Sequence, residues 1–166
     1  MVSLKFVMGE GMIADKPIER LASLVPTALI LLGARLTVAN QFWKSGRAKV
    51  EGWNVFDLKD GAYMLFQNEY SFKTPFGDIY LPFPDLWAHA AAIGEHLFPA
   101  LLVLGLASRF AALGLLAMTI VIQLIYPGAW LEYHLWWAVL LLIVMRYGAG
   151  ALSLDQVIRT IGNAKS

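Results

Sequence analysis

The sequence predicts an all-α integral membrane protein, a four-helix bundle whose long, aromatic first loop caps the outer side. Composition is the first observation. Hydrophobic residues make up 58% of the 166 and charged residues 15%, against roughly 45–50% and 25% in soluble domains. A single domain of this size cannot bury so much apolar surface in water. The second observation is that apolar residues gather in four runs, and the third is the aromatic density between the first two runs.

Four apolar runs come near the roughly 20 residues that a spanning helix needs. They are expected at about residues 21–43, 86–107, 110–126 and 133–147. The first contains Arg35 and the second contains Glu95, whereas the third carries no charge. The fourth is short for a span. A chain of this length allows one domain, so residues 1–166 are expected to form a single membrane domain.

The predicted outer loop, about residues 45–84, separates the first two helices. Its aromatic side chains are Trp53, Phe56, Tyr63, Phe66, Tyr70, Phe72, Phe76, Tyr80 and Phe83. Because aromatic rings favour the membrane–water boundary, we expect this loop to fold over one end of the bundle. Within it, "DGAYMLFQNEY" is consistent with a short helix, and "FKTPFGDIYLPFP" with extended or turning chain.

The C-terminal segment, about residues 153–162, is expected to form an amphipathic helix on the membrane surface, capped by Ser153. Four spans place both termini on one side of the membrane. The basic residues on that side are Lys5, Lys16, Arg20, Arg109, Arg146, Arg159 and Lys165. Because positive residues mark the cytoplasmic side, we expect cytoplasmic termini and an outward-facing loop.

Charge and cysteine usage exclude some classes of function. The net charge is +1, so nothing indicates a nucleic-acid partner, and the lipid bilayer is the partner that the composition implies. The chain has no cysteine. This excludes disulfides, thiolate metal ligands and thiol redox chemistry within the chain.

Arg35 and Glu95 are predicted to form an ion pair. Counting from Lys44 and Asp85 at the outer helix ends, with a rise of roughly 1.5 Å per residue, the two charges lie about 13 and 15 Å deep. A lone charge at that depth costs about 2.5–3.5 kcal/mol, and pairing relieves both. Two interpretations stay open. The pair fixes the helix register, or it serves function, as ionisable groups inside membranes generally do.

The remaining polar side chains fall in the same outer half of the predicted bundle and come from all four helices. Together they form the predicted ligand site: Asn40, His89, Glu95, His96, Gln123 and His134. His89 and His96 share a helix face, whereas Glu95 points about 100° away. His89 and His134 are each equally consistent with an interfacial hydrogen bond. No tight ligand spacing such as HxxxH occurs, so no metal site is predicted, and a bound metal or haem is less favoured than an organic ligand.

Three stretches resemble the DoxX family, together covering about residues 20–158. "ALILLGARLTVANQFWKSGRAKV" resembles its first helix, with a mid-helix Arg followed by a turn containing Gly and Lys; here these are Arg35, Gly46 and Lys49. "AAAIGEHLFPALLVLGLASRFAALGLLAMT" resembles its second and third helices, with a Glu before an apolar run and a "GL-x-x-R" turn. "GAGALSLDQVI" resembles its C-terminal ending.

The resemblance implies a four-helix bundle in a bacterial inner membrane and an association with oxidoreductase complexes. It therefore implies partners among membrane or periplasmic redox proteins. A quinone or similar molecule suits an apolar pocket with a few convergent polar groups. The long aromatic loop and the absence of cysteine depart from the family pattern. Two alternatives remain, a structural or assembly partner for other membrane proteins and a carrier of a small solute or metal ion. Catalysis and homo-oligomer formation stay open.

Overall fold

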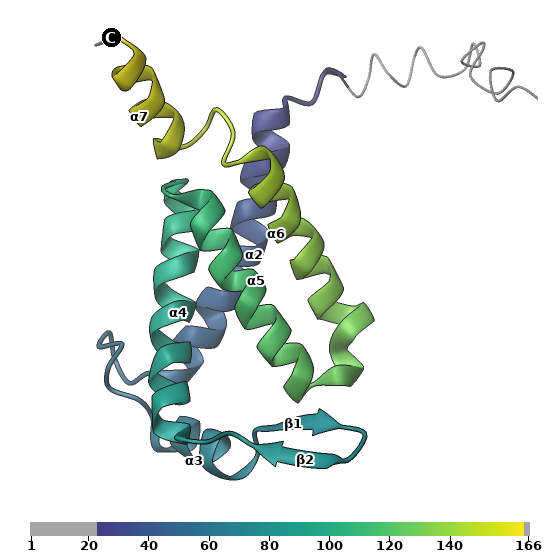
Figure 1. Cartoon of the computed structure of the whole chain (residues 1–166). Coiled ribbons are helices and arrows are strands. Elements are labelled where there is room, and N and C mark those ends of the chain that lie inside the picture. The colour runs from purple at the N-terminus through teal and green to yellow at the C-terminus, as the bar shows by residue number, and fades with distance from the viewer. Residues whose placement is uncertain (1–22, 165–166) are drawn as a thin grey trace, which may run out of the picture.

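Four long helices pack together lengthwise in the computed structural model, which describes residues 23–164. They are α2 (Thr27–Lys49), α4 (Pro84–Leu104), α5 (Ser108–Ile125) and α6 (Leu135–Tyr147) (Figure 1). Some predictions concern residues outside that range. These are the first two helix residues, 21–22, and the basic residues Lys5, Lys16, Arg20 and Lys165.

Each bundle helix packs against two neighbours, because α2 contacts α4 and α6, and α5 contacts the same two helices. The fully buried core between them includes Val38, Phe42, Leu102, Leu115 and Leu141. The ring of Phe42 also meets the ring of Trp137, with centroids 5.3 Å apart. The predicted fold class, an all-α membrane bundle, is confirmed.

Three segments of residues 23–164 are long and apolar enough to cross a membrane: Pro84–Leu104, Ser108–Ile125 and Pro127–Tyr147. Four such segments were predicted. The first bundle helix, α2, has 23 residues and is therefore about 34 Å long. It is not among the three because it carries the polar residues Arg35, Asn40, Gln41 and Lys44.

The last apolar segment begins earlier than the predicted residue 133. A 3-10 turn, Pro127–Ala129, and a π-helical turn, Trp130–His134, lead directly into α6. The added length therefore lies at the start of the segment. At its other end, Gly148 and Gly150 have φ angles of 80° and 79°, which end the helix.

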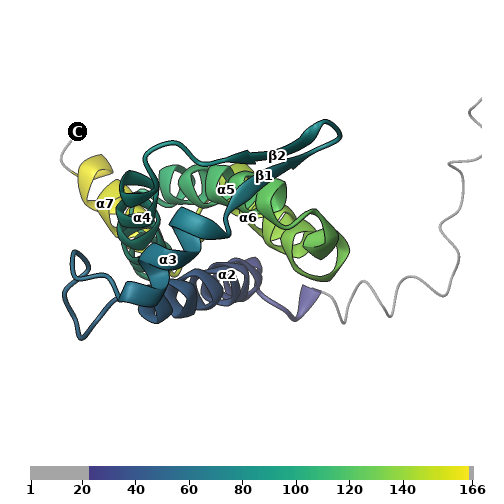
Figure 2. The same ribbon diagram turned by 90° about the horizontal axis from the view of Figure 1, so that it is seen from below.

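The chain between α2 and α4 folds over one end of the bundle and is called the cap (Figure 2). It contains α3 (Asp60–Asn68) and an antiparallel hairpin of β1 (Ser71–Thr74) and β2 (Gly77–Tyr80). The apolar side chains that seat it on α4 and α5 are Val50, Leu58, Phe66, Leu81, Ala88, Ala92 and Ile125. Because α2 continues past residue 45 to Lys49, the cap begins only at Val50.

The opposite end of the bundle carries α7 (Leu154–Asn163) (Figure 1). The Ser153 hydroxyl accepts a hydrogen bond from the Gln156 N–H at 3.2 Å, which confirms the predicted cap. The Asp155 carboxylate accepts the N–H groups of Ala107 and Ser108 at 2.8 and 3.0 Å. Burial opposes ionisation, but these bonds from Ser108 and Ala107 keep the pKa of Asp155 below its usual value. Asp155 thus fastens α7 to the turn between α4 and α5.

Candidate functional site

Arg35 does not pair with Glu95, so this prediction is wrong. The buried guanidinium donates instead to the backbone carbonyls of Leu102, Val103, Ala149 and Leu152, at 2.8, 3.0, 2.5 and 2.9 Å. Two of these carbonyls belong to the last turn of α4, where the helix dipole favours a cation. The other two follow α6. We call Arg35 with its four acceptors the carbonyl joint, because it ties three chain segments together.

The depth estimate fails because α2 does not end near Lys44 but continues to Lys49. Arg35 therefore lies roughly 14 residues, or about 21 Å, from the cap end of its helix. Its contacts with Leu102 and Val103 place it about two helical turns beyond Glu95. The two charges lie at different levels of the bundle.

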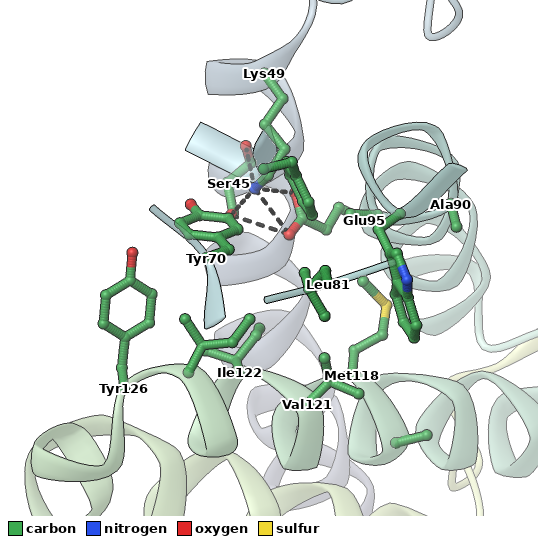
Figure 3. A pocket seen from close by; sticks show the side chains of 15 residues that line it. Ser45, Lys49, Tyr70, Leu81, Ala90, Glu95, Met118, Val121, Ile122 and Tyr126 are labelled. Atoms are coloured by element: carbon green, nitrogen blue, oxygen red, sulfur yellow. Dashed lines mark hydrogen bonds and ion pairs between the residues drawn. The ribbon is translucent and has the colours of Figure 1, made fainter. Parts of the chain in front are cut away.

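Glu95 pairs with Lys49. The Lys49 Nζ lies 2.8 Å from Oε2 and 3.0 Å from Oε1 of Glu95, and it donates to the Ser45 Oγ at 2.9 Å. The Ser45 hydroxyl in turn donates to the Glu95 Oε1 at 3.2 Å. Only 3% of the Glu95 side chain and 14% of the Lys49 side chain are exposed. These three residues form a closed hydrogen-bonded group, called the polar triad (Figure 3).

A glycine brings the two helices of the polar triad close together. A Cβ added at Gly46 would lie 2.8 Å from the His96 ring and 3.0 Å from the Glu95 Cβ. Any other residue there would push α2 away from α4. Ser45 and Lys49 are four residues apart and so lie on the same helix face. Both side chains therefore reach Glu95 across a short gap.

The polar triad lines a cavity of about 290 Å³ between α2, the cap, α4 and α5 (Figure 3). The other lining side chains are apolar or aromatic: Phe66, Tyr70, Leu81, Trp87, Ala90, Ala91, Ala117, Met118, Val121, Ile122, Ile125 and Tyr126. A mostly apolar cavity with a few convergent polar groups is the usual form of a small-molecule site.

Two small side chains of the cavity lining are also exposed on the outside of the bundle. Ala90 of α4 and Ala117 of α5 line the cavity, and both are also exposed on the bundle surface. Both helices are long and apolar enough to span a membrane. Part of the cavity wall is therefore formed by residues that are exposed on these two apolar helices.

Two tyrosines contribute hydroxyl groups to the cavity wall. The rings of Tyr70 and Tyr126 meet edge to face, with centroids 5.9 Å apart. Burial, followed by the neighbouring Tyr126 hydroxyl, raises the pKa of Tyr70 above its usual value. The Tyr70 phenol therefore stays protonated at physiological pH and remains able to donate a hydrogen bond.

His96 and His89 lie outside this cavity lining. The His96 Nδ1 bonds the Ala92 carbonyl at 2.7 Å, and the ring stands edge-on to Trp43, with centroids 5.1 Å apart. Its Nε2 has no hydrogen-bond partner within residues 23–164. His89 bonds the Asp85 carbonyl at 2.8 Å and the Tyr63 hydroxyl at 3.3 Å, which joins α4 to α3.

Gln123 and His134 bond each other. The His134 Nδ1 lies 2.6 Å from the Gln123 Oε1, while the Gln123 Nε2 donates to the Pro127 carbonyl at 3.0 Å. Because the amide nitrogen already donates, its oxygen accepts, and the His134 Nδ1 carries the proton. Asn40 lies apart from both, in a groove between α2 and α4.

Of the six residues predicted to share a ligand site, the cavity brings in Glu95 alone. Within the described part of the chain, no group of three or more His, Asp or Glu residues is arranged to hold a metal ion. Sequence reasoning misses Ser45 and Lys49 because it ends the first helix where charged residues begin. The available signal is that "FWKSGRAK" contains no proline, so the helix can continue.

The comparisons with known proteins agree with these motifs. The DoxX family model matches residues 30–128, a range that contains Arg35, the polar triad and its cavity. A protein of Haemophilus influenzae described as an uncharacterized protein is 32% identical over 158 residues, which cover 86% of this chain and 91% of that protein. No solved structure matches. The chain belongs to the DoxX family.

Proposed function

We propose that this DoxX protein is a redox-associated membrane subunit. Its cavity would bind a small apolar molecule with a polar head group, of which a quinone is the best fit. The observation that carries the proposal is the charged, buried polar triad in the wall of an otherwise apolar cavity. Ionisable groups at membrane depth are costly, and they commonly mark functional sites.

The chemistry of the lining suits a head group that changes between accepting and donating hydrogen bonds. The Lys49 ammonium, the Ser45 hydroxyl and the Tyr70 phenol are donors that match a carbonyl oxygen. The Glu95 carboxylate is an acceptor that matches a hydroxyl group. A quinone presents carbonyl oxygens, and its reduced form presents hydroxyls. The apolar side chains of α4 and α5 suit the remainder of such a molecule.

Ala90 and Ala117 line the cavity and are also exposed on two apolar helices, which supports a ligand that enters the cavity from the membrane. A water-soluble solute would have to cross hydrocarbon to reach it. The three histidines lie at separate helix contacts, which favours an organic ligand over a metal ion or haem. Membrane or periplasmic redox proteins are the partners that would exchange electrons with such a ligand.

We place the protein in a bacterial inner membrane with cytoplasmic termini and the cap outside. Arg109, Arg146 and Arg159 lie at the end that carries α7. At the cap end, Lys49 and Lys73 are in ion pairs with Glu95 and Asp78. Counted over the whole sequence, the predicted cytoplasmic side has seven basic residues and the cap side has five, namely Lys44, Arg47, Lys49, Lys59 and Lys73, which favours cytoplasmic termini under the positive-inside rule.

A single cysteine at Gly61 tests this orientation, because the chain has no other cysteine and Gly61 is exposed on α3. A membrane-impermeant thiol reagent is expected to label it from outside intact cells. A matched cysteine at Arg159 in α7 should react only after permeabilisation. The reverse pattern would contradict the orientation.

Quinone binding is best measured by fluorescence quenching in lipid nanodiscs, because Trp87 lines the cavity. Short-chain ubiquinone and menaquinone are the probes, and saturable quenching that Trp87→Phe diminishes is the expected result. Ala117→Leu adds a larger side chain to the cavity wall. It should weaken quinone binding about tenfold, the order of effect that small changes in apolar volume have in such pockets.

Leu113→Phe is the matched control, since Leu113 lies one turn away on α5 and is 52% exposed. It should bind like the unmodified chain. Equal affinity in the Ala117→Leu variant would contradict this binding site. If no quinone binds saturably, the polar triad is a structural element, and the chain is better described as an assembly partner of other membrane proteins.

A further inference from the structure

The helix α2 forms one side of the bundle (Figure 2), and several polar side chains on it are exposed. Four of them are those of Thr37, Asn40, Gln41 and Lys44. Their spacing of three and four residues places them in one stripe along the helix. Gly33 continues the stripe, and a Cβ added there would meet nothing within 4 Å.

Contacts at two levels fix the depth of this stripe. Near the cap, Lys49 bonds Glu95 of α4, and at the other end Arg35 bonds the carbonyls of Leu102 and Val103. The part of α2 between these contacts therefore lies alongside residues 95–103 of α4. Because α4 is long and apolar enough to span a membrane, the stripe is at hydrocarbon depth.

Two amides on this face lack hydrogen bonds. Neither Asn40 nor Gln41 has a bonding partner within the part of the chain that the structure describes. Lipid tails offer none, and an unpaired amide in an apolar medium is costly. Burial in a protein interface removes this cost when the facing surface supplies both donors and acceptors.

An apolar groove of about 580 Å³ lies between α2 and α4, and Asn40 is one of the residues that line it. The other lining residues include Trp43 of α2 and Ala100 and Val103 of α4. This side of α2 therefore carries a stripe of exposed polar side chains, two of them without hydrogen bonds within residues 23–164, next to an apolar groove. A lipid chain fits the groove but leaves the amides unpaired.

We propose that α2 packs against α2 of a second copy of this chain about a two-fold axis. An amide is both donor and acceptor, so the same side chains from two copies satisfy each other across an isologous interface. Gly33 and Thr37 have the small-xxx-small spacing that lets membrane helices approach closely. Two helices that cross at such a motif move apart with distance from the crossing point. Lys44 therefore lies at the margin of the contact.

Single cysteines test the contact directly, because the chain has none of its own. In lipid vesicles, Thr37→Cys is expected to give an oxidatively cross-linked dimer. Ile120→Cys is the matched control, since Ile120 is 57% exposed on α5 and should give at most background cross-linking. Equal yields from both positions would contradict the proposed face.

The Asn40→Leu/Gln41→Leu double variant tests the amides. Energy transfer between labelled copies in vesicles should show a dimer dissociation constant raised about tenfold or more, since interhelical hydrogen bonds are lost on both copies. A thermal unfolding curve confirms that the double variant is folded.

Three results would overturn the proposal. The first is an unmodified chain that stays monomeric in vesicles at all protein-to-lipid ratios. The second is a double variant that dimerises as well as the unmodified chain. The third is rapid reaction of Asn40→Cys with a water-soluble reagent, which would show a water-lined face. None of these results bears on quinone binding, which uses a different side of α4.

Discussion

Arg35 and Lys49 are two buried cations on one helix, and the structure satisfies them in opposite ways. The carbonyl joint surrounds Arg35 with four backbone oxygens. Lys49 is held by the side chains of Ser45 and Glu95 in a cavity wall. Backbone carbonyls are fixed by the helices that carry them, whereas side chains rotate and exchange partners. A buried charge therefore marks a functional site only when its partners are free to change.

The largest expected effect is at the carbonyl joint. Arg35→Met removes the guanidinium from four backbone carbonyls, of which that of Leu102 keeps the Gly105 N–H as a donor, and we expect a loss of about 4 kcal/mol or more in the free energy of unfolding. Denaturant unfolding in mixed micelles measures it. Arg47→Met is the control, because Arg47 stacks over the Trp53 ring at 4.6 Å and should lose about 1 kcal/mol or less. Similar losses for both variants would show that the carbonyl joint stabilises the fold no more than an exposed stacking contact does.

The polar triad should show strong coupling between its charges. Glu95→Gln or Lys49→Met alone strands a buried partner, at a cost of about 3 kcal/mol. The double variant is expected to lose less than the sum of the two single losses. A double-mutant cycle of unfolding free energies measures the coupling, and simple additivity would show that the pair is not a unit.

Gly105 tests how tightly the carbonyl joint is packed. Its φ is 68°, and an added Cβ would lie 2.5 Å from the Ser153 Cβ and 3.0 Å from the Arg35 Nη2. Gly105→Ala should therefore lower the unfolding free energy by about 2 kcal/mol. Gly61→Ala in α3 is the control, since an added Cβ there meets nothing within 4 Å. It should be neutral or slightly stabilising. Equal changes in unfolding free energy for the two variants would show that the backbone around Gly105 shifts to accommodate the added methyl group at little cost.

The smallest expected effect concerns pH at the same end. Because the pKa of Asp155 is lowered in the folded protein, its stabilisation is complete above the unfolded value of about 3.9 and is lost as the pH falls through the lower folded value. The protection of the α7 amides against hydrogen exchange, taken relative to the intrinsic exchange rate at each pH, should therefore fall in acid. Asp155→Asn should remove this pH dependence and cost about 1 kcal/mol at neutral pH. An unchanged acid response in that variant would assign the effect to another group.

The sequence predicts the architecture well because hydrophobic runs and aromatic clustering report directly on lipid exposure. The short helix at 60–68, the extended and turning chain of the proline-containing stretch and the Ser153 cap all follow from local patterns, whereas the pairing of that stretch into a hairpin was not predicted. These features depend on neighbours along the chain.

The site is predicted less well because it depends on where α2 ends. Six further helical residues, 44 to 49, move Lys49 onto Glu95 and place Arg35 two turns away from it. Arg35 bonds backbone carbonyls, which every residue has. The amino-acid sequence therefore does not indicate which residues are its partners. The depth of each residue is counted from the predicted end of its helix. An error in that helix end therefore changes every contact that depends on depth.

The acceptors of Arg35 also set an order on biosynthesis. Arg35 enters the membrane with the first bundle helix, but the carbonyls of Ala149 and Leu152 lie 114 and 117 residues later in the chain. Until translation delivers them, the guanidinium has only part of its final set of partners. The bundle therefore closes late, when the segment after α6 leaves the ribosome. A chain truncated after Tyr147 lacks the Ala149 and Leu152 carbonyls and leaves Arg35 with only the two acceptors of α4.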